Sequence, residues 1–421
     1  MRSLNFLLVP FVCNNYDLNQ LQDIKEELIK SGHSATKINR IITEDELSEL
    51  VNEGNYNCVF RVNGPRPYKI KKDVRFITWY QDFYFDSNKQ LESFKSSDIV
   101  YFYTAPEAFG IQKKLNCLTS NFYPGINDIN NGEDLQSISK ITSINKYQNV
   151  DLSLLGVMIS LNICNFNNFH YRNYKNFENH QVANMDYSYF INRLDKDEKK
   201  LTINEYKEFV CELQNIVELN YKPLSGELEI FELVKKIRKT IKKNFRNPNQ
   251  QIFKEWQRFF STEYPRFLDR LNMARLMSRF SNNFIVVSDG WERLNEFSDF
   301  YREKIDDKID LYELFKKTKI NLYTNTHGGG MHNKIFEIMI NGGFVALPIS
   351  SRNNMLGGIE ECFIDGEHFS SFNPHKFDEF IDNWLNNSEK RLLIGNNARK
   401  EVLDKHTWRS RINKLLNDLS H

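Results

Sequence analysis

The N-terminal part of the chain alternates short apolar runs with amphipathic segments. Four runs predict β-strands, at residues 5–12, 56–62, 75–80 and 98–103. Between them, residues 18–30 predict an amphipathic helix that ends at Gly32. Thr43, with Glu46 three residues later, predicts a capping box that begins a second helix ending near Gly54. This alternation implies a parallel sheet with crossover helices, and such sheets bind ligands at the carboxyl ends of their strands.

Between residues 165 and 281 the alternation stops and lysine-rich helical patterns replace it. The clearest helix carries an apolar stripe made of Leu228, Phe231, Val234, Ile237, Ile241 and Phe245. Lysines and one arginine surround the stripe. Either the stripe packs on the body of the protein and the cations are solvated, or the basic surface meets anionic lipid, where lipid-linked acceptors reside. We interpret residues 165–281 as a helical insertion or an elaborated interdomain region.

The alternation returns after residue 287. A helix is predicted over residues 311–316, a strand over 320–323, a helix over 332–341 and a strand over 344–347. An apolar segment at 362–364 and a polar turn at 365–367 follow. The last helices are predicted over 374–386, 389–404 and 407–419.

A loop of three consecutive glycines, residues 328–330, separates the predicted strand at 320–323 from its helix. Because glycine has no side chain, backbone N–H groups at the start of the next helix can approach an anion closely, which is how α/β folds bind phosphate. The helix places His332, Lys334 and Glu337 in its first two turns. A lysine neutralises phosphate and a carboxylate accepts hydrogen bonds from vicinal hydroxyls, so this set suits a sugar nucleotide.

Length and composition limit the number of domains, the kinds of partner and the state of the cysteines. The 421 residues predict two domains, and 40% hydrophobic residues are enough for conventional cores. A net charge of +1 gives no argument for a nucleic-acid partner. The six cysteines, at positions 13, 58, 117, 164, 211 and 362, show no close pairing, which indicates reduced thiols rather than a disulfide framework or a zinc knuckle.

No apolar stretch approaches the roughly 18 residues that a membrane span requires. The apolar run at residues 4–12 is short, lacks a small-residue cleavage site and is interpreted as the first strand. We therefore expect a cytoplasmic protein, which touches the inner face of the membrane peripherally if the basic helix meets lipid.

The segment Lys319-Ile-Asn-Leu, followed by the glycine loop, His332-Asn-Lys-Ile-Phe-Glu-Ile-Met and Gly342-Gly-Phe-Val, resembles the donor site of group 1 glycosyltransferases. It is most similar to the subgroup typified by the spore maturation protein CgeB. Three further stretches support the resemblance, at residues 150–156, 283–291 and 406–411. The similarity covers the C-terminal half well and the N-terminal half in outline.

This resemblance implies an α/β protein of two Rossmann-like domains that face each other across a cleft, the GT-B arrangement. Residues 1–149 would form the acceptor-side domain, and residues 150–406 the nucleotide-sugar domain, including the helical insertion. Residues 407–421 would be a C-terminal helix that returns to the first domain. The oligomeric state stays open.

The resemblance also implies roles for individual residues. The glycines Gly328, Gly329 and Gly330 would admit the donor diphosphate, Lys334 would neutralise it, and Glu337 would bind ribose or sugar hydroxyls. His332 would contact the donor phosphate or sugar. The remaining expected donor-site residues are Asn333, Asp289, Gly290 and Trp291, with Trp291 as core the alternative.

A second polar element, Trp79-Tyr-Gln-Asp82, follows the predicted strand at 75–80. Asp82 would orient or deprotonate an acceptor hydroxyl while Trp79 or Tyr80 stacks on a sugar face. In the alternative interpretation, Trp79 belongs to the core and Asp82 caps the next helix.

No cofactor and no metal ion are predicted, the nucleotide-sugar being a substrate. Asp195-Lys-Asp197 matches the Asp-x-Asp metal pattern of the other large glycosyltransferase fold, but it lies in a charged run without a flanking apolar strand. His327 and His332 bracket the glycine loop without a third ligand nearby in the sequence.

The chain departs from the family pattern at two positions. Retaining members carry two glutamates eight positions apart; the second matches Glu337, but the first falls on Gly329. Lys334 stands where the subgroup has arginine, a better bidentate phosphate ligand. The stereochemical outcome, the donor base and the donor sugar therefore stay open.

The predicted function is transfer of a sugar from a nucleotide-sugar to a hydroxyl of a glycan or lipid-linked acceptor, in surface polysaccharide or glycoconjugate synthesis. Two alternatives are a nucleotide-sugar epimerase of similar fold and a non-catalytic GT-B-like binding protein.

Overall fold

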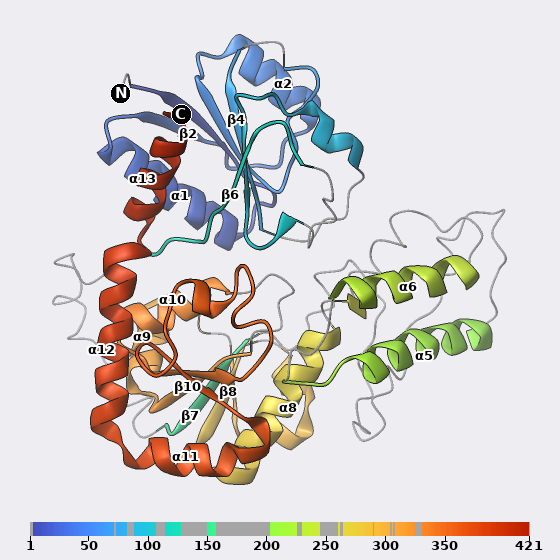
Figure 1. The fold of residues 1–421 in the computed structure, drawn as a ribbon, viewed down its shortest axis with the longest axis vertical. Helices are drawn as coiled ribbons and strands as arrows, with labels where there is room; N and C mark the ends of the chain where they lie inside the picture. The colour runs from blue at the N-terminus through green and yellow to red at the C-terminus, as the bar shows by residue number, and fades with distance from the viewer. Residues whose placement is uncertain are drawn as a thin grey trace.

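The computed structural model describes residues 3–70, 73–81, 88–106, 114–127, 150–156, 203–224, 230–244, 260–261, 264–288, 290–303, 305, 308–324 and 331–420. Figure 1 shows two α/β bodies, each built on its own sheet, with α12 and α13 running from the second body to the first. The two sheets have six strands each, and every strand pair is parallel.

The first sheet has the strand order β2-β1-β3-β4-β5-β6. Its strands are β1 (Asn5–Val9), β2 (Ser34–Lys37), β3 (Cys58–Val62), β4 (Arg75–Tyr80), β5 (Ile99–Phe102) and β6 (Leu118–Asn121). The four predicted strands are present, with ends that differ by a few residues. The edge strands β2 and β6 were not predicted, because neither is an apolar run: none of their residues is buried.

Two helices follow β1 and β2 as the sequence predicts. Helix α1 (Asn15–Lys30) packs on the sheet, with Ile24 and Leu28 in the same core as Phe6 of β1. Helix α2 (Glu44–Glu53) begins with the predicted capping box between Thr43 and Glu46. Each of these two residues pairs with a backbone N–H that the helix leaves unbonded, which fixes where the helix starts.

The second sheet has the order β12-β11-β10-β7-β8-β9. Its strands are β7 (Leu152–Leu155), β8 (Phe284–Val287), β9 (Tyr301–Arg302), β10 (Ile320–Leu322), β11 (Val345–Pro348) and β12 (Ser370–Phe372). After β9 the chain crosses back to place β10 on the other side of β7. The strand order therefore reverses between β7 and β10, and ligands of such folds bind outside the carboxyl ends at this point.

The apolar segment at residues 362–364 does not form a strand. It follows a short 3₁₀ helix, Ile359–Glu361, and leads into a turn whose Gly366 has a φ of 79°. The chain needs this left-handed turn to enter β12, which the apolar pattern did not reveal.

The helices around the second sheet are α8 (Tyr264–Phe280), α9 (Lys308–Lys317), α10 (Asn333–Ile340), α11 (Phe377–Asn386) and α12 (Ser388–Lys405). Helix α10 is the one predicted after the glycine loop. It buries Ile335, Phe336, Ile338 and Met339, whereas its Asn333 and Glu337 line a pocket shared with α1 of the first body.

Helices α5 (Ile203–Asn220) and α6 (Ile230–Asn244) form a pair that extends away from the second sheet in Figure 1. The stripe residues Ile237 and Ile241 are fully buried, in one core cluster with Leu213 and Val217 of α5. This burial favours protein packing over lipid contact for the stripe. Among the residues that the structure describes, no helix is long and apolar enough to cross a membrane.

The two bodies are linked by chain segments that run side by side. Ile126, after β6, forms an isolated bridge with Thr407, which caps the last helix, α13 (Trp408–Asp418). Helix α13 packs on the first sheet, where Trp408 meets Trp79 edge to face at a centroid distance of 6.1 Å. The last helix therefore completes the core of the first body, although it follows the second in sequence.

Candidate active site between the two sheets

The carboxyl ends of β7 and β10 lie where the strand order of the second sheet reverses. Gly156 follows β7, and Arg270 of α8 lies against it: a Cβ added at Gly156 would come within 2.7 Å of Nε of Arg270. Because Gly156 has no side chain, the guanidinium of Arg270 fits beside the carboxyl edge of the sheet. Ligands of parallel sheets bind at this edge.

Three cations gather at this edge, and we call Arg266, Arg270 and Lys334 the basic cluster. Arg266 and Arg270 are four residues apart on α8 and so share one face of that helix. Burial, together with the charges of Arg270 and Arg266, lowers the pKa of Lys334 to about 8, and the charge of Glu337 opposes this shift. Burial and two like charges thus disfavour the charged form of this lysine.

The two arginines of the basic cluster were missed in the sequence. They lie in a helix that otherwise buries residues such as Phe267, Leu268 and Leu271, and the 264–280 segment was interpreted as part of an insertion. The available signal was their spacing of four residues, which places both arginines on one face of a helix.

His332 caps α10 and contacts the first body. Its Nδ1 accepts a hydrogen bond from the Lys334 backbone N–H at 3.3 Å, so the neutral ring carries its proton on Nε2. Burial, followed by the charges of Lys334 and the two arginines, holds the pKa of His332 well below its ordinary value. Tyr16 of α1 stacks on the ring at a centroid distance of 6.2 Å.

Glu337 faces a pocket of about 310 Å³ between α1, α9, α10 and the segment after β6. It lies one turn after Asn333, whose Nδ2 donates to its Oε1 at 2.9 Å. Burial raises the pKa of Glu337, and the charges of Lys334 and Lys308 oppose that rise. The carboxylate is thus placed between the basic cluster and a cavity that a ligand can enter.

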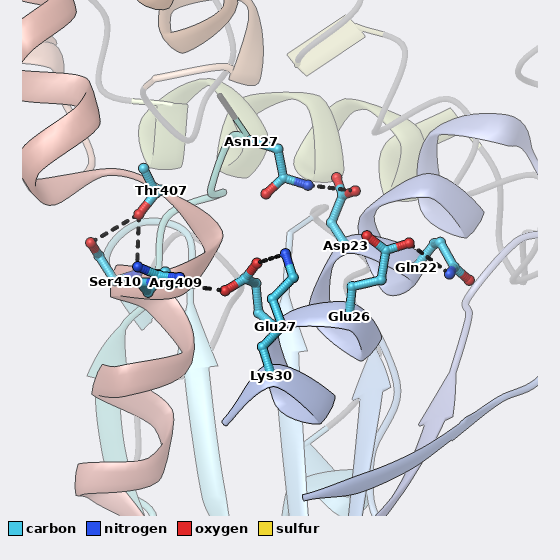
Figure 2. Close-up of polar contacts among 9 residues, drawn as sticks. All are labelled: Gln22, Asp23, Glu26, Glu27, Lys30, Asn127, Thr407, Arg409 and Ser410. Carbon is cyan, nitrogen blue, oxygen red and sulfur yellow. Dashed lines mark hydrogen bonds and ion pairs between the residues drawn. The ribbon is translucent and has the colours of Figure 1, made fainter. Parts of the chain in front are cut away.

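A second carboxylate reaches the same pocket from the first body. Asp23 of α1 accepts a hydrogen bond from Nδ2 of Asn127 at 2.9 Å, as Figure 2 shows. Burial raises its pKa to about 6, while Lys308 opposes the shift. Both bodies therefore contribute polar groups to one cavity.

Two tryptophans that were considered as ligand contacts are core residues. Trp79 is fully buried and donates its indole N–H to the Phe122 carbonyl at 2.8 Å. Trp291 is also fully buried, and its indole N–H donates to the Gly156 carbonyl at 2.8 Å. Neither ring offers a face to a sugar, so the core alternative holds for both, and Trp291 instead anchors the end of β7.

Gly290 has a φ of 96°, a left-handed conformation that favours glycine, and its N–H donates to Glu292 at 2.6 Å. Other predicted positions lie outside the described residues: Asp82, Asp289, Gly328, Gly329, Gly330, His327, Asp195 and Asp197. Their roles stay predictions. Within the described ranges, no group of three or more His, Cys, Asp or Glu side chains is placed to hold a metal ion.

Part of the chain is similar to a known protein family. A family model described as glycosyl transferase-like matches residues 256–417, which include the basic cluster and Glu337. No curated protein matches the chain in sequence.

Solved structures match it over nearly its whole length. A glycosyltransferase from Rickettsia africae covers 100% of this chain and 98% of its own, at 11% identity and a TM-score of 0.52. Anabaena HepE in complex with UDP and glucose covers 99% and 100%, at 10% identity and a TM-score of 0.53. AviGT4, a glycosyltransferase of avilamycin A biosynthesis, covers 99% and 97%, at 8% identity and a TM-score of 0.50.

At these identities the likeness establishes the fold. The chain is an α/β protein with two parallel six-stranded sheets in the GT-B arrangement, and its residues 256–417 are similar to the glycosyl transferase-like family. The predicted fold class is confirmed, whereas the CgeB-like subgroup stays a prediction.

Proposed function

We propose that this protein is a glycosyltransferase that binds a nucleotide-sugar at the carboxyl edge of the second sheet. The observation that carries the proposal is the basic cluster, in which Arg266, Arg270 and Lys334 meet beside the N-terminus of α10. Cations and helix N–H groups at this place suit an anionic diphosphate, because their positive charge stabilises the phosphates without a metal ion.

A cluster of cations fits the chemistry of sugar transfer, in which a diphosphate leaves. As the bond between the sugar and the diphosphate breaks, negative charge builds on the leaving oxygen, and preorganised cations lower the energy of that state. The lowered pKa of Lys334 supports this assignment, because an arriving anion offsets the repulsion among the three cations. Gly328, Gly329 and Gly330 admit the diphosphate in this proposal.

The remaining roles follow from the pocket and the family resemblance. Glu337 accepts hydrogen bonds from donor hydroxyls, and His332 orients the donor from the cap of α10. Asp82 activates an acceptor hydroxyl on a glycan or a lipid-linked sugar, and Asp289 and Gly290 close the donor side. We assign the reaction to surface polysaccharide or glycoconjugate synthesis at the cytoplasmic side of the membrane.

A ligand screen tests this function. In a thermal-shift assay with UDP-, GDP-, TDP-, ADP- and CMP-sugars, we expect one nucleotide class to raise the melting temperature. Saturation at 100 times Kd contributes about 2.7 kcal/mol of stability. Product analysis with the matching donor and a glycan acceptor should then show a new glycosidic bond. Conversion of the donor sugar without an acceptor would indicate an epimerase, and binding without turnover a binding protein.

Transfer should persist in excess EDTA. The basic cluster and the N-terminus of α10 supply the positive charge that a divalent ion supplies elsewhere. The measurement compares initial rates with EDTA, with added Mg²⁺ and with added Mn²⁺. A complete loss in EDTA that either ion restores would instead support a metal role for Asp195 and Asp197.

A further inference from the structure

The pocket between α1, α9 and α10 contains two buried polar atoms without a hydrogen-bond partner in the part of the chain that the structure describes. Nε2 of Gln20 is one, although Oε1 of the same side chain accepts from Nε2 of Gln81 at 3.0 Å. Oδ1 of Asn333 is the other, although its Nδ2 donates to Glu337. Gln20 is only 5% exposed. Buried polar atoms of this kind are costly to leave unpaired, so a ligand that pairs with both is favoured.

These two atoms define the chemistry of the ligand. One is a donor and the other an acceptor, and the carboxylate of Glu337 adds a second acceptor in the same cavity. A hydroxylated ring or a heterocycle with an imide edge offers the complementary groups, and a nucleoside contains both kinds. The volume of about 310 Å³ lies at the lower end of the range for small-molecule pockets.

The position of the pocket identifies which part of a ligand it holds. Asn333 and Lys334 are consecutive residues in the first turn of α10, with Lys334 in the basic cluster and Asn333 in the pocket. A phosphate at the basic cluster therefore has its attached group within one helical turn of Asn333 and Glu337. In a sugar nucleotide, the group on one side of the diphosphate is the nucleoside.

We propose that this pocket binds the donor nucleoside and that α1 of the first body recognises it through Gln20. The inference rests on the proposed function and extends it, because the donor is then held by both bodies rather than by the second alone. Gln20 and Asp23 come from the first body, and Asn333 and Glu337 from the second. Nucleotide binding consequently depends on how closely the two bodies approach each other.

The test compares two glutamines of the same helix. Gln20→Met removes the unpaired donor and keeps the side-chain length, whereas Gln22→Met changes a surface residue that donates to Glu26 at 2.9 Å, as Figure 2 shows. Affinities for UDP, GDP, TDP, ADP, CMP and inorganic pyrophosphate are measured by calorimetry. For the nucleotide that binds the wild type, we expect Gln20→Met to raise Kd about tenfold, which corresponds to about 1.4 kcal/mol. Pyrophosphate affinity should not change, and Gln22→Met should match the wild type for every ligand.

Each other outcome has a distinct meaning. Unchanged nucleotide affinity in Gln20→Met overturns the proposal, and a raised KM for the acceptor in that variant would place the acceptor in the pocket. Nucleotides that bind no more tightly than pyrophosphate also overturn it, while leaving the phosphate site intact. Binding of neither pyrophosphate nor any nucleotide rejects the proposed function itself. If Gln20→Met does not fold, Gln20→Glu keeps an acceptor for Gln81 and replaces the donor by a carboxylate oxygen. Because the added charge repels every anion, the readout is then the ratio of nucleotide affinity to pyrophosphate affinity, which should fall.

Discussion

Replacement of Lys334 by methionine should weaken nucleoside diphosphate binding by about 10- to 100-fold, the effect of losing one charge-assisted hydrogen bond. The melting temperature of the free protein should stay the same or rise. Burial and two neighbouring arginines lower the pKa of Lys334 from 10.5 to about 8, which means that its charge destabilises the folded state when no anion is bound. A residue that is needed for binding and unfavourable for folding is typical of a ligand site.

The same pKa predicts a pH signature. The cost of the charged lysine is fully present below about pH 8 and disappears as the pH rises toward 10.5, so the gain in melting temperature of Lys334→Met should be largest at neutral pH. Nucleotide affinity of the wild type should fall as the pH rises through about 8, whereas Lys334→Arg, which keeps its charge, should show a flatter profile. Lys400→Met, at an exposed position of α12, is the control. Equal affinity of Lys334→Met and wild type would remove Lys334 from the phosphate site.

Replacement of Glu337 by glutamine should lower the transfer rate by about one to two orders of magnitude, because each charge-assisted hydrogen bond to a donor hydroxyl is worth roughly 1.5–3 kcal/mol. The shape of the side chain and its contact with Asn333 are retained. Burial raises the pKa of Glu337, so its charge is held at a cost and the glutamine variant should melt at the same temperature or higher. The measurement is turnover and melting temperature on one preparation.

A structural role for Glu337 would give the opposite pair of results. If its main task is to neutralise Lys334, the glutamine variant leaves a buried cation unpaired and should melt well below the wild type, with normal turnover in the folded fraction. Glu389→Gln, at an exposed position in the first turn of α12, separates this effect from a general loss of acidic charge.

The sequence by itself determined most elements that are local. Apolar runs predicted the central strands of the first sheet and β10 and β11 of the second, whereas the stretches that contain β7 and β8 were singled out by the family resemblance. Thr43 and Glu46 predicted the start of α2, and the segment at 332–341 predicted α10. These signals are readable because they depend on residues a few positions apart. The edge strands β2 and β6 were not predicted, because they contain no apolar run. They form by hydrogen bonding to the neighbouring strands β1 and β5.

Only the tertiary structure decided which side chains meet. Lys334 and Glu337 were found from the sequence, since they lie on one helix after a glycine loop. Arg266 and Gln20 were not, because they belong to helices that local pattern links to an insertion and to the other domain. The structure also shows that Trp79 and Trp291, which were candidate ligand contacts, are buried core residues. Spacing along the chain determines periodicity and caps, whereas the convergence of charges and unpaired polar atoms depends on how the two bodies are placed relative to each other.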